Sequence, residues 1–291
     1  MASYYSAEEM EKLFEVAQGH KLELIIQLAA FYGLRRAEVM GLRWEAIDFE
    51  AKTLTIRHIV TSTRIDGKKI LVEADRAKTK SSLRTLPLVD PIAERLKAVK
   101  EQQEETEETI THLESIMTEL DIARKEEDLL VIRQELSDFG YMKGKRSGKK
   151  GKPIKKSKPL HFISSDGYDI FVGKNNYQND ELTFKTATGN DWWFHAKNMP
   201  GSHVIVKTNG EEPPIKTFEE AGSLAAYFSK GKGADKVEID YTQKKNVKKP
   251  NGGKPGFVVY YTNYSLMASS HIEGIRCVNA EDSVFLERSY V

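Results

Sequence analysis

Apolar residues recur with a helical period in the first part of the chain. Ser6 and Glu9 have the spacing of an N-terminal capping box, in which each side chain satisfies a free amide of the other residue. The apolar positions that follow recur every three or four residues, at Met10, Leu13, Phe14 and Ala17. A second segment, KLELIIQLAAFYG over 21–33, is apolar almost all round and stops at Gly33. The pattern predicts two helices, of which the second is buried and ends in a left-handed cap.

The next segments change period. Residues 33–58 predict a short helix followed by an alternating β-strand, and KTKSSLRTLPL over 78–88 predicts the arm of a hairpin. Within this region the motif GLRRAEVMGLRW is fairly specific. Through this motif, residues 6–103 resemble the beginning of the catalytic domain of the tyrosine recombinases, and within that family the integrases of phages and conjugative transposons.

The recombinase resemblance implies roles for two basic residues. By this resemblance Arg35 binds the scissile phosphate and Lys78 protonates the leaving oxygen. A guanidinium group matches phosphate oxygens, and a lysine held near a leaving oxygen can act as a general acid. The same family needs a His-x-x-Arg pair and a tyrosine nucleophile. None of the seven histidines is followed by arginine three positions later. We therefore expect no catalytic activity, since nucleophile, acid and clamp must act together.

A helical pattern returns over residues 110–139. Apolar residues fall every three or four positions, first at Ile110, Leu113, Met117 and Leu120, then in a shifted phase at Leu129, Ile132, Leu136 and Phe139. The shift predicts two short helices joined by a bend. Packing of these helices on their own domain and pairing in a dimeric coiled coil both remain open.

Strand patterns dominate after Tyr168. Strands are predicted at 168–173, 181–187, 191–196, 203–208, 236–242 and 257–262, and one helix at 217–231, begun by a capping box of Thr217 and Glu220. Strands on both sides of a single helix predict an α+β fold with a mixed β-sheet packed on that helix.

Charge is balanced in total but divided into blocks. The chain has 44 basic and 43 acidic residues, yet 101–138 is acidic, 143–158 is basic, and a second lysine cluster lies between 244 and 254. Such runs are either solvated loops or surfaces that bind phosphate groups. Lys149 and Lys150 in the first block, and Lys244 and Lys245 in the second, are the candidates for phosphate contacts.

Cysteine and hydropathy limit the class of protein. Cys277 is the single cysteine, which excludes an intrachain disulfide framework and a zinc site built from several cysteines. No apolar run approaches the length of a membrane span, and the N-terminal residues do not have the pattern of a signal peptide. We expect a cytoplasmic protein with no membrane partner, no metal and no cofactor.

The longest distinctive stretch begins at DGYDIFVGKNNYQNDELTFKTATGNDWWFHAKNMPGSHVIVKT and continues with KVEIDYTQKKNVKKPNGGKPGFVVYYTNYSLMA. Through these motifs residues 107–268 resemble the NFACT family, including its RqcH and NEMF-like members, and the NFACT-R RNA-binding domain. The resemblance implies ribosome-associated quality control: binding of stalled large ribosomal subunits and transfer RNA, and support of alanine tailing. The family's large N-terminal domain and helix-hairpin-helix have no counterpart in these residues.

The stretch NDWWFHAKNMPGSH is the candidate site within this region. Strand alternation sends neighbouring side chains to opposite faces, so we assign Trp192 and Phe194 to the core and Trp193 to the solvent side. His195 and His203 lack a third ligand for zinc, and we expect them to form a hydrogen-bonded pair. The predicted RNA-binding side chains, which offer amides, cations and an aromatic face, are Lys174, Asn175, Asn176, Gln178, Trp193, His195, Lys197 and His203.

The predicted organisation is chimeric. It comprises a partial recombinase domain at 1–103, a helical segment at 104–142, a basic linker at 143–160, an NFACT-R domain at 161–268 and an unassigned tail at 269–291. The leading hypothesis is a non-enzymatic protein that binds RNA, either transfer RNA or the large ribosomal subunit. The alternatives are a catalytically incomplete integrase remnant that binds DNA and a surface adhesin, which the family's fibronectin-binding name suggests.

Overall fold

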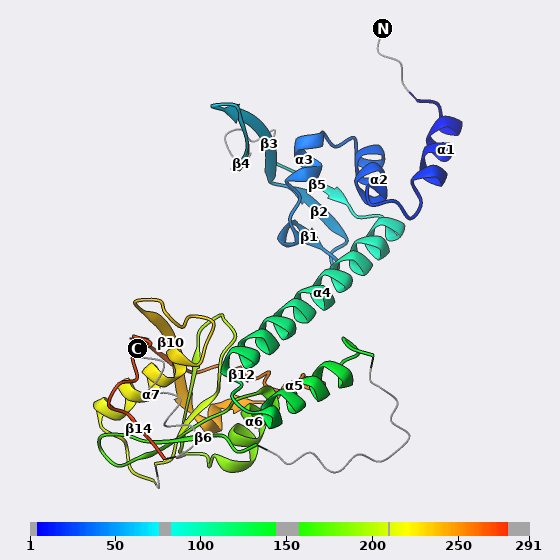
Figure 1. The fold of residues 1–291 in the computed structure, drawn as a ribbon. Coiled ribbons are helices and arrows are strands. Elements are labelled where there is room, and N and C mark those ends of the chain that lie inside the picture. Colours follow the sequence, from blue (N-terminus) through cyan, green and yellow to red (C-terminus); the bar gives the residue numbers. More distant parts are fainter. Residues whose placement is uncertain (1–4, 76–82, 144–156, 209, 279–291) are drawn as a thin grey trace. The chain divides into compact units, whose positions relative to one another are not determined.

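The chain divides into two compact units, residues 1–107 and 108–291 (Figure 1). The computed structural model describes residues 5–75, 83–143, 157–208 and 210–278. Helix α4 (Asp90–Ile122) crosses the division between them. Within the described residues, no helix combines the length and the apolarity that a bilayer crossing requires.

Unit one contains short helices and two antiparallel sheets. Its helices are α1 (Ala7–Ala17), α2 (Glu23–Tyr32), α3 (Arg36–Met40) and the 3-10 turn η1 (Trp44–Ala46). Strands β1 (Ile47–Asp48), β2 (Thr53–Ile56) and β5 (Arg84–Pro87) form a sheet in the order β1-β2-β5, and β3 (His58–Ile65) pairs with β4 (Lys68–Asp75). The core of the unit gathers Leu28, Leu54, Ile56, Ile92 and Leu96.

Several local predictions for unit one are confirmed. Ser6 Oγ accepts a hydrogen bond from the Glu9 amide at 3.2 Å, and Glu9 Oε2 accepts one from the Ser6 amide at 2.7 Å. Gly33 caps α2 in the left-handed region, at φ 60° and ψ 32°. The prediction that α2 is buried all round was wrong, because Phe31 is 59% exposed while Leu28 is 3% exposed.

Helices α4 and α5 (Glu126–Asp138) show the predicted bend, which falls between Ile122 and Glu126. The apolar stripe predicted over 110–120 of α4 is exposed and does not pack on its own domain, while pairing in a coiled coil stays a prediction. Met117 is 66% exposed and Leu120 is 47% exposed, whereas Ile116 is 2% exposed. The buried face of the end of α4 is therefore mixed, and it includes the polar residues His112 and Glu119.

Unit two is built on a seven-stranded sheet in the order β13-β10-β8-β9-β7-β6-β14. Its strands are β6 (Leu160–Ile163), β7 (Asp169–Val172), β8 (Trp192–Ala196), β9 (Val204–Val206), β10 (Val237–Gln243), β13 (Tyr264–Ala268) and β14 (Arg276–Cys277). The α+β class is confirmed. All pairings described in this sheet are antiparallel, where a mixed sheet was expected.

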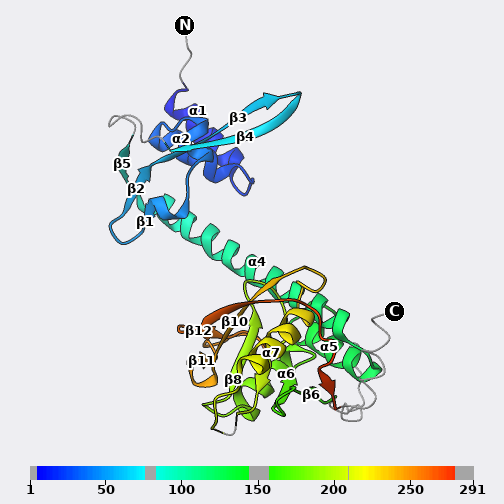
Figure 2. The same cartoon turned by 90° about the vertical axis from the view of Figure 1, so that its left-hand side faces the viewer.

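Both faces of this sheet are covered. Helix α7 (Ile215–Tyr227), yellow in Figure 2, packs on one face, where its Leu224 shares a core with the strand residues Phe194 and Ile239. The other face is covered by α6 (Asn176–Glu181), a π-helical turn η2 (Leu182–Thr186), and the hairpin of β11 (Val247–Lys248) and β12 (Val259–Tyr260), which follows the 3-10 turn η3 (Lys244–Asn246).

Two predictions for unit two were wrong. Residues 181–187 lie at the end of α6 and in η2 rather than in a strand. Helix α7 starts before the predicted capping box, so Thr217 and Glu220 lie inside it. They tie α7 to the β6–β7 turn instead: Thr217 Oγ1 lies 2.8 Å from Asp166 Oδ2, and the Ser165 amide donates to Glu220 Oε2 at 2.8 Å.

Candidate functional site

Strand β8 sends Trp192 and Trp193 to opposite faces of the sheet. Trp192 packs edge-on against Phe218 of α7, with ring centroids 4.9 Å apart, and Phe194 is fully buried on the same face. This part of the prediction is confirmed. The exposure of Trp193 was wrong: it is 0% exposed, because Leu182, Val247 and their neighbours form a second core over its ring. Trp193 cannot stack on a base.

Lys174 is not a free surface cation. It is 3% exposed, and its Nζ lies 2.8 Å from Asp128 Oδ1 of α5. Burial opposes ionisation of Asp128, but hydrogen bonds led by the one from Lys174 outweigh it and hold the pKa of this carboxyl below its usual range. A buried ion pair thus engages Lys174, which the sequence placed at the surface, and its contact with RNA stays a prediction.

The amide side chains beside Lys174 are buried as well. Asn175 caps α6, since its Oδ1 accepts the Gln178 amide hydrogen at 3.0 Å, and Gln178 Oε1 accepts the Lys174 amide hydrogen at 2.9 Å. Asn176 reaches α5, where its Nδ2 donates to Glu135 Oε1 at 3.0 Å. These three residues are 2–7% exposed. Their hydrogen bonds are thus made within the protein, and their contacts with RNA stay predictions.

Two carboxylates and a histidine complete this buried polar cluster. Glu119 Oε1 accepts the Asn176 amide hydrogen at 2.6 Å, and His112 Nε2 lies 2.9 Å from Glu135 Oε1. Burial, and after it the charge of Glu135, raises the pKa of Glu119 well above its ordinary value. Glu119 therefore holds a proton under conditions in which an exposed glutamate is ionised.

His195 and His203 lie together but do not form the expected hydrogen-bonded pair. Their rings meet edge to face with centroids 5.4 Å apart, and His203 Nδ1 lies 2.8 Å from Thr183 Oγ1. Burial lowers the pKa of His195 to about 4 and the pKa of His203 well below its ordinary value. Neutral rings of this kind offer no charge to RNA, and His203 is only 1% exposed, so its contact with RNA stays a prediction that the burial does not favour. In the described part of the chain, no group of three or more His, Cys, Asp or Glu side chains converges as a metal site.

The remaining predicted residues have different surroundings. Lys197 is at the surface but pairs with Glu238 at 2.6 Å, and the hydrogen bond that it donates to Glu238 is the main reason its pKa is raised. Arg35 has a 74% exposed side chain whose guanidinium lies 3.7 Å from Glu38. Lys78, Lys149 and Lys150 lie outside the described residues.

Lys244 and Lys245 belong to an exposed basic surface. We call Lys185, Lys244 and Lys245 the lysine cluster; Lys185 comes from η2 and the other two from η3. The Lys244 ammonium lies 5.7 Å from the centroid of the Phe184 ring. Lys185 and Lys245 are exposed.

A buried aspartate fixes the loop that supports the lysine cluster. Asp191 Oδ2 accepts the Thr188 amide hydrogen at 2.6 Å, and Lys207 bonds to the same oxygen. Burial opposes ionisation of Asp191, but the hydrogen bonds led by Lys207 lower its pKa. The backbone carbonyl of Asp191 accepts the Lys244 amide hydrogen at 2.8 Å. Asp191 therefore holds the Thr188 loop through its side chain and the start of η3 through its backbone.

An exposed tyrosine lies in the segment that follows β12. Tyr261 follows β12 and is 82% exposed, and the carbonyl of Thr262 accepts a 2.6 Å hydrogen bond from Thr242, just before η3. Cations beside exposed rings suit unpaired nucleotides, which need both phosphate contacts and stacking. Sequence reasoning missed Lys185, Phe184 and Tyr261. The first two were assigned to a strand, and a run of apolar residues at 257–261 gave no sign that Tyr261 lies outside the core.

Comparison with known proteins gives two adjacent family matches. Residues 158–261 match the family described as NFACT protein RNA binding domain, and residues 92–155 match NFACT N-terminal and middle domains. The Rqc2 homolog RqcH of Streptococcus suis is 42% identical over 207 residues, which is 69% of this chain and 37% of that protein. The chain thus spans little more than a third of the length of this relative.

A solved structure and a second relative extend the comparison. The C-terminal part of the fibronectin/fibrinogen-binding protein from Streptococcus suis superposes with a TM-score of 0.59 at 40% identity, covering 64% of this chain and 75% of that one. A tyrosine recombinase XerC-like protein of Caldanaerobacter subterraneus is 37% identical over 105 residues, which is 35% of this chain and 27% of that protein. The sheet, its flanking helices and the two adjacent matches agree: over residues 92–261 the chain belongs to the NFACT family.

Proposed function

We propose that this chain binds RNA in ribosome-associated quality control, with transfer RNA or RNA of the large ribosomal subunit as its ligand. The observation that carries the proposal is the lysine cluster, in which Lys244 faces the Phe184 ring, on the NFACT-R part of the chain. The RqcH relative and the NEMF relatives, which are described as ribosome quality control complex subunits, support the same setting. DNA binding by unit one has support only from the recombinase-like relative, which covers 35% of the chain.

The lysine cluster is the part of this surface that is open to phosphates. Lys174, Lys197 and Lys249 are engaged by Asp128, Glu238 and Asp180. The ammonium of Lys244 instead faces a ring, and the Lys245 amide donates to the Gly189 carbonyl at 3.1 Å, while no ion pair joins its ammonium to a carboxylate among the described residues. Phosphates therefore displace no carboxylate when they approach these two lysines, and the attraction weakens as salt rises.

The test is to replace Lys185, Lys244 and Lys245 with glutamine and to measure binding of labelled transfer RNA by fluorescence anisotropy over a range of salt concentrations. We expect affinity to fall at least about tenfold, and the salt slope to become shallower by about 0.7 for each single-strand phosphate that the variant no longer neutralises. The matched control replaces Lys216, Lys232 and Lys236, which are exposed elsewhere on the same unit. Equal affinity in the two triple variants would rule out the cluster as the interface.

We also propose that the chain has no recombinase activity. Arg35 pairs with Glu38, a carboxylate that Arg84 also binds at 3.0 Å, and no histidine in the sequence is followed by arginine at the required spacing. A covalent adduct between the protein and a nicked attachment-site DNA would contradict this.

A further inference from the structure

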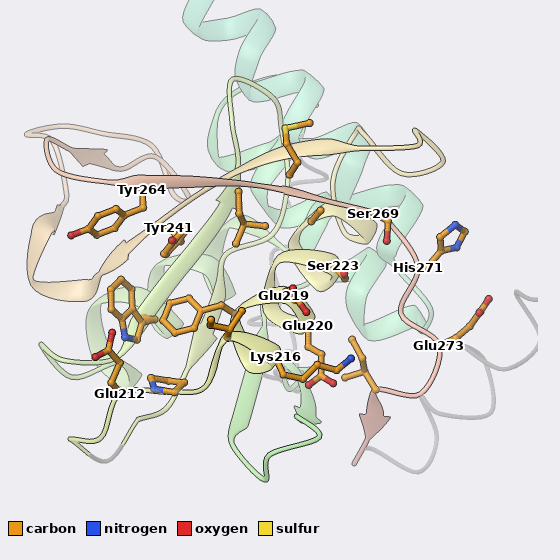
Figure 3. Close-up of a pocket in the computed structure, with 18 residues that line it drawn as sticks. Glu212, Lys216, Glu219, Glu220, Ser223, Tyr241, Tyr264, Ser269, His271 and Glu273 are labelled. Carbon is orange, nitrogen blue, oxygen red and sulfur yellow. The ribbon is translucent and has the colours of Figure 1, made fainter.

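A groove lies beside α7, on the face of the sheet opposite to the lysine cluster. Its volume is about 790 Å³, and it is bounded by α7 and by the chain from Tyr264 to Ile275. Figure 3 shows Tyr241 and Tyr264 at one end and His271 and Glu273 at the other, with Lys216 and Glu219 of α7 between them. A groove of this size has room for several side chains of a ligand.

One end of the groove is aromatic. Trp192 and Tyr264 have ring centroids 6.5 Å apart, and Tyr241 lies 5.5 Å from Tyr264. Tyr264 is 59% exposed, so its ring is partly open to the groove. Such rings attract planar cations, and guanidinium groups in particular, through their electron-rich faces.

The rim of the groove is acidic. Glu212, Glu219 and Glu273 are exposed lining residues, and in the described part of the chain no ion pair involves any of them. Lys216 is the one Lys or Arg among the described lining residues. This excess of negative charge repels phosphates and favours a cationic ligand.

The strand that borders the groove is at the edge of the sheet. Strand β13 pairs with β10 on one side, and within the described residues no strand pairs with its other side. Its alternate residues Tyr264 and Leu266 face the groove. A free strand edge accepts an extended peptide through backbone hydrogen bonds, while alternate side chains of that peptide enter the adjacent pockets.

We propose that this groove binds an extended, arginine-rich segment of a protein partner. The peptide backbone pairs with β13, an arginine side chain stacks on Tyr264 and Trp192, and the rim carboxylates bind the guanidinium groups. Arginine fits better than lysine because its planar fork both stacks and makes paired hydrogen bonds with carboxylates. The surface is separate from the lysine cluster, since Trp192 and Trp193 face opposite sides of the sheet.

The test uses the full chain and a labelled peptide of about ten residues in which arginine alternates with serine, so that side chains on one face are all cationic. Replacing Glu212, Glu219 and Glu273 with glutamine should weaken binding at least about tenfold in fluorescence anisotropy at low salt. The matched control replaces Glu126, Glu181 and Glu211, which are exposed and lie outside the groove. A second variant, Tyr264→Ala, should weaken the arginine peptide more than a lysine–serine peptide of equal length.

Two further measurements separate the outcomes. Hydrogen exchange at residues 264–268 should slow when the arginine peptide binds, because the edge amides become bonded. Equal binding by the groove variant and its control overturns the proposal. The proposal is also overturned if a single-stranded oligonucleotide binds the wild-type chain and not the groove variant, because the groove would then be a site for nucleobases. Transfer RNA binding through the lysine cluster should be the same in both glutamate variants, so the two functions fail separately.

Discussion

Glu119 shows how burial changes the chemistry of one residue. Its carboxyl group is 3% exposed and faces the charge of Glu135, while its Oε1 accepts the Asn176 amide hydrogen. Its folded pKa lies above its unfolded value, so the folded state binds more protons over the interval between them. This contribution to stability is fully present below the unfolded pKa and is lost as pH rises through the folded pKa.

The raised pKa of Glu119 gives a prediction for the substitution Glu119→Gln. Glutamine keeps an oxygen that can accept the Asn176 amide hydrogen but cannot ionise, so the variant should gain stability relative to the wild type as pH rises above the ordinary pKa of glutamate. The free energies of unfolding would be measured in urea by circular dichroism at several pH values. Glu126→Gln, at an exposed position of α5, should give a difference that does not change with pH. A pH-independent difference for Glu119→Gln as well would refute the raised pKa.

At the scale of elements, one helix presents two very different faces. Ile116 and Met117 are neighbours in α4, yet the first is 2% exposed and the second 66% exposed. Ile116→Ala should destabilise unit two by about 2–5 kcal/mol, because it removes buried methyl groups and leaves a cavity. Met117→Ala should change stability by less than about 0.5 kcal/mol.

Thermal unfolding of the two variants, followed by circular dichroism, measures this contrast. A large decrease of stability in Met117→Ala would show that the exposed apolar face of α4 is covered in solution. A decrease below about 1 kcal/mol for Ile116→Ala would show that the buried face is not packed as described.

The same helix shows what sequence patterns can and cannot predict. Periodicity located α1, α2, the bend before α5, α7 and the strands β7, β8, β9 and β10, because these signals are local, but it did not predict β3, β4 or β13. It did not identify the side of α4 that packs within unit two, because that side is decided by distant polar partners such as Asn176, which only the fold brings together. For the same reason Lys174 and Trp193 were assigned to the surface: a second layer over the sheet cannot be inferred from strand alternation alone.

The whole molecule has separate cores. The cluster around Leu54 and Ile92 lies within unit one, and the clusters around Phe194 and Trp193 lie within unit two. We predict that Leu54→Ala lowers the stability of unit one by about 2–5 kcal/mol. Below the unfolding transition, its affinity for transfer RNA should equal that of the wild type.

Hydrogen exchange resolved by peptide, together with anisotropy, would test this separation. Ile65→Ala, at a 54% exposed position of unit one, is the matched control and should change neither quantity. Weaker RNA binding by Leu54→Ala alone would show that the recombinase-like unit contributes to the RNA interface.

The two adjacent tryptophans also make the sheet a natural optical probe. The chain has three tryptophans, so replacing Trp44 and one of the pair with phenylalanine leaves a single emitting indole. Trp192 lines the groove beside α7, whereas Trp193 is enclosed on the other face next to His195. In the two single-tryptophan variants, the emission wavelength and the quenching by dissolved iodide would therefore report on opposite faces of strand β8, from residues that are neighbours in the chain.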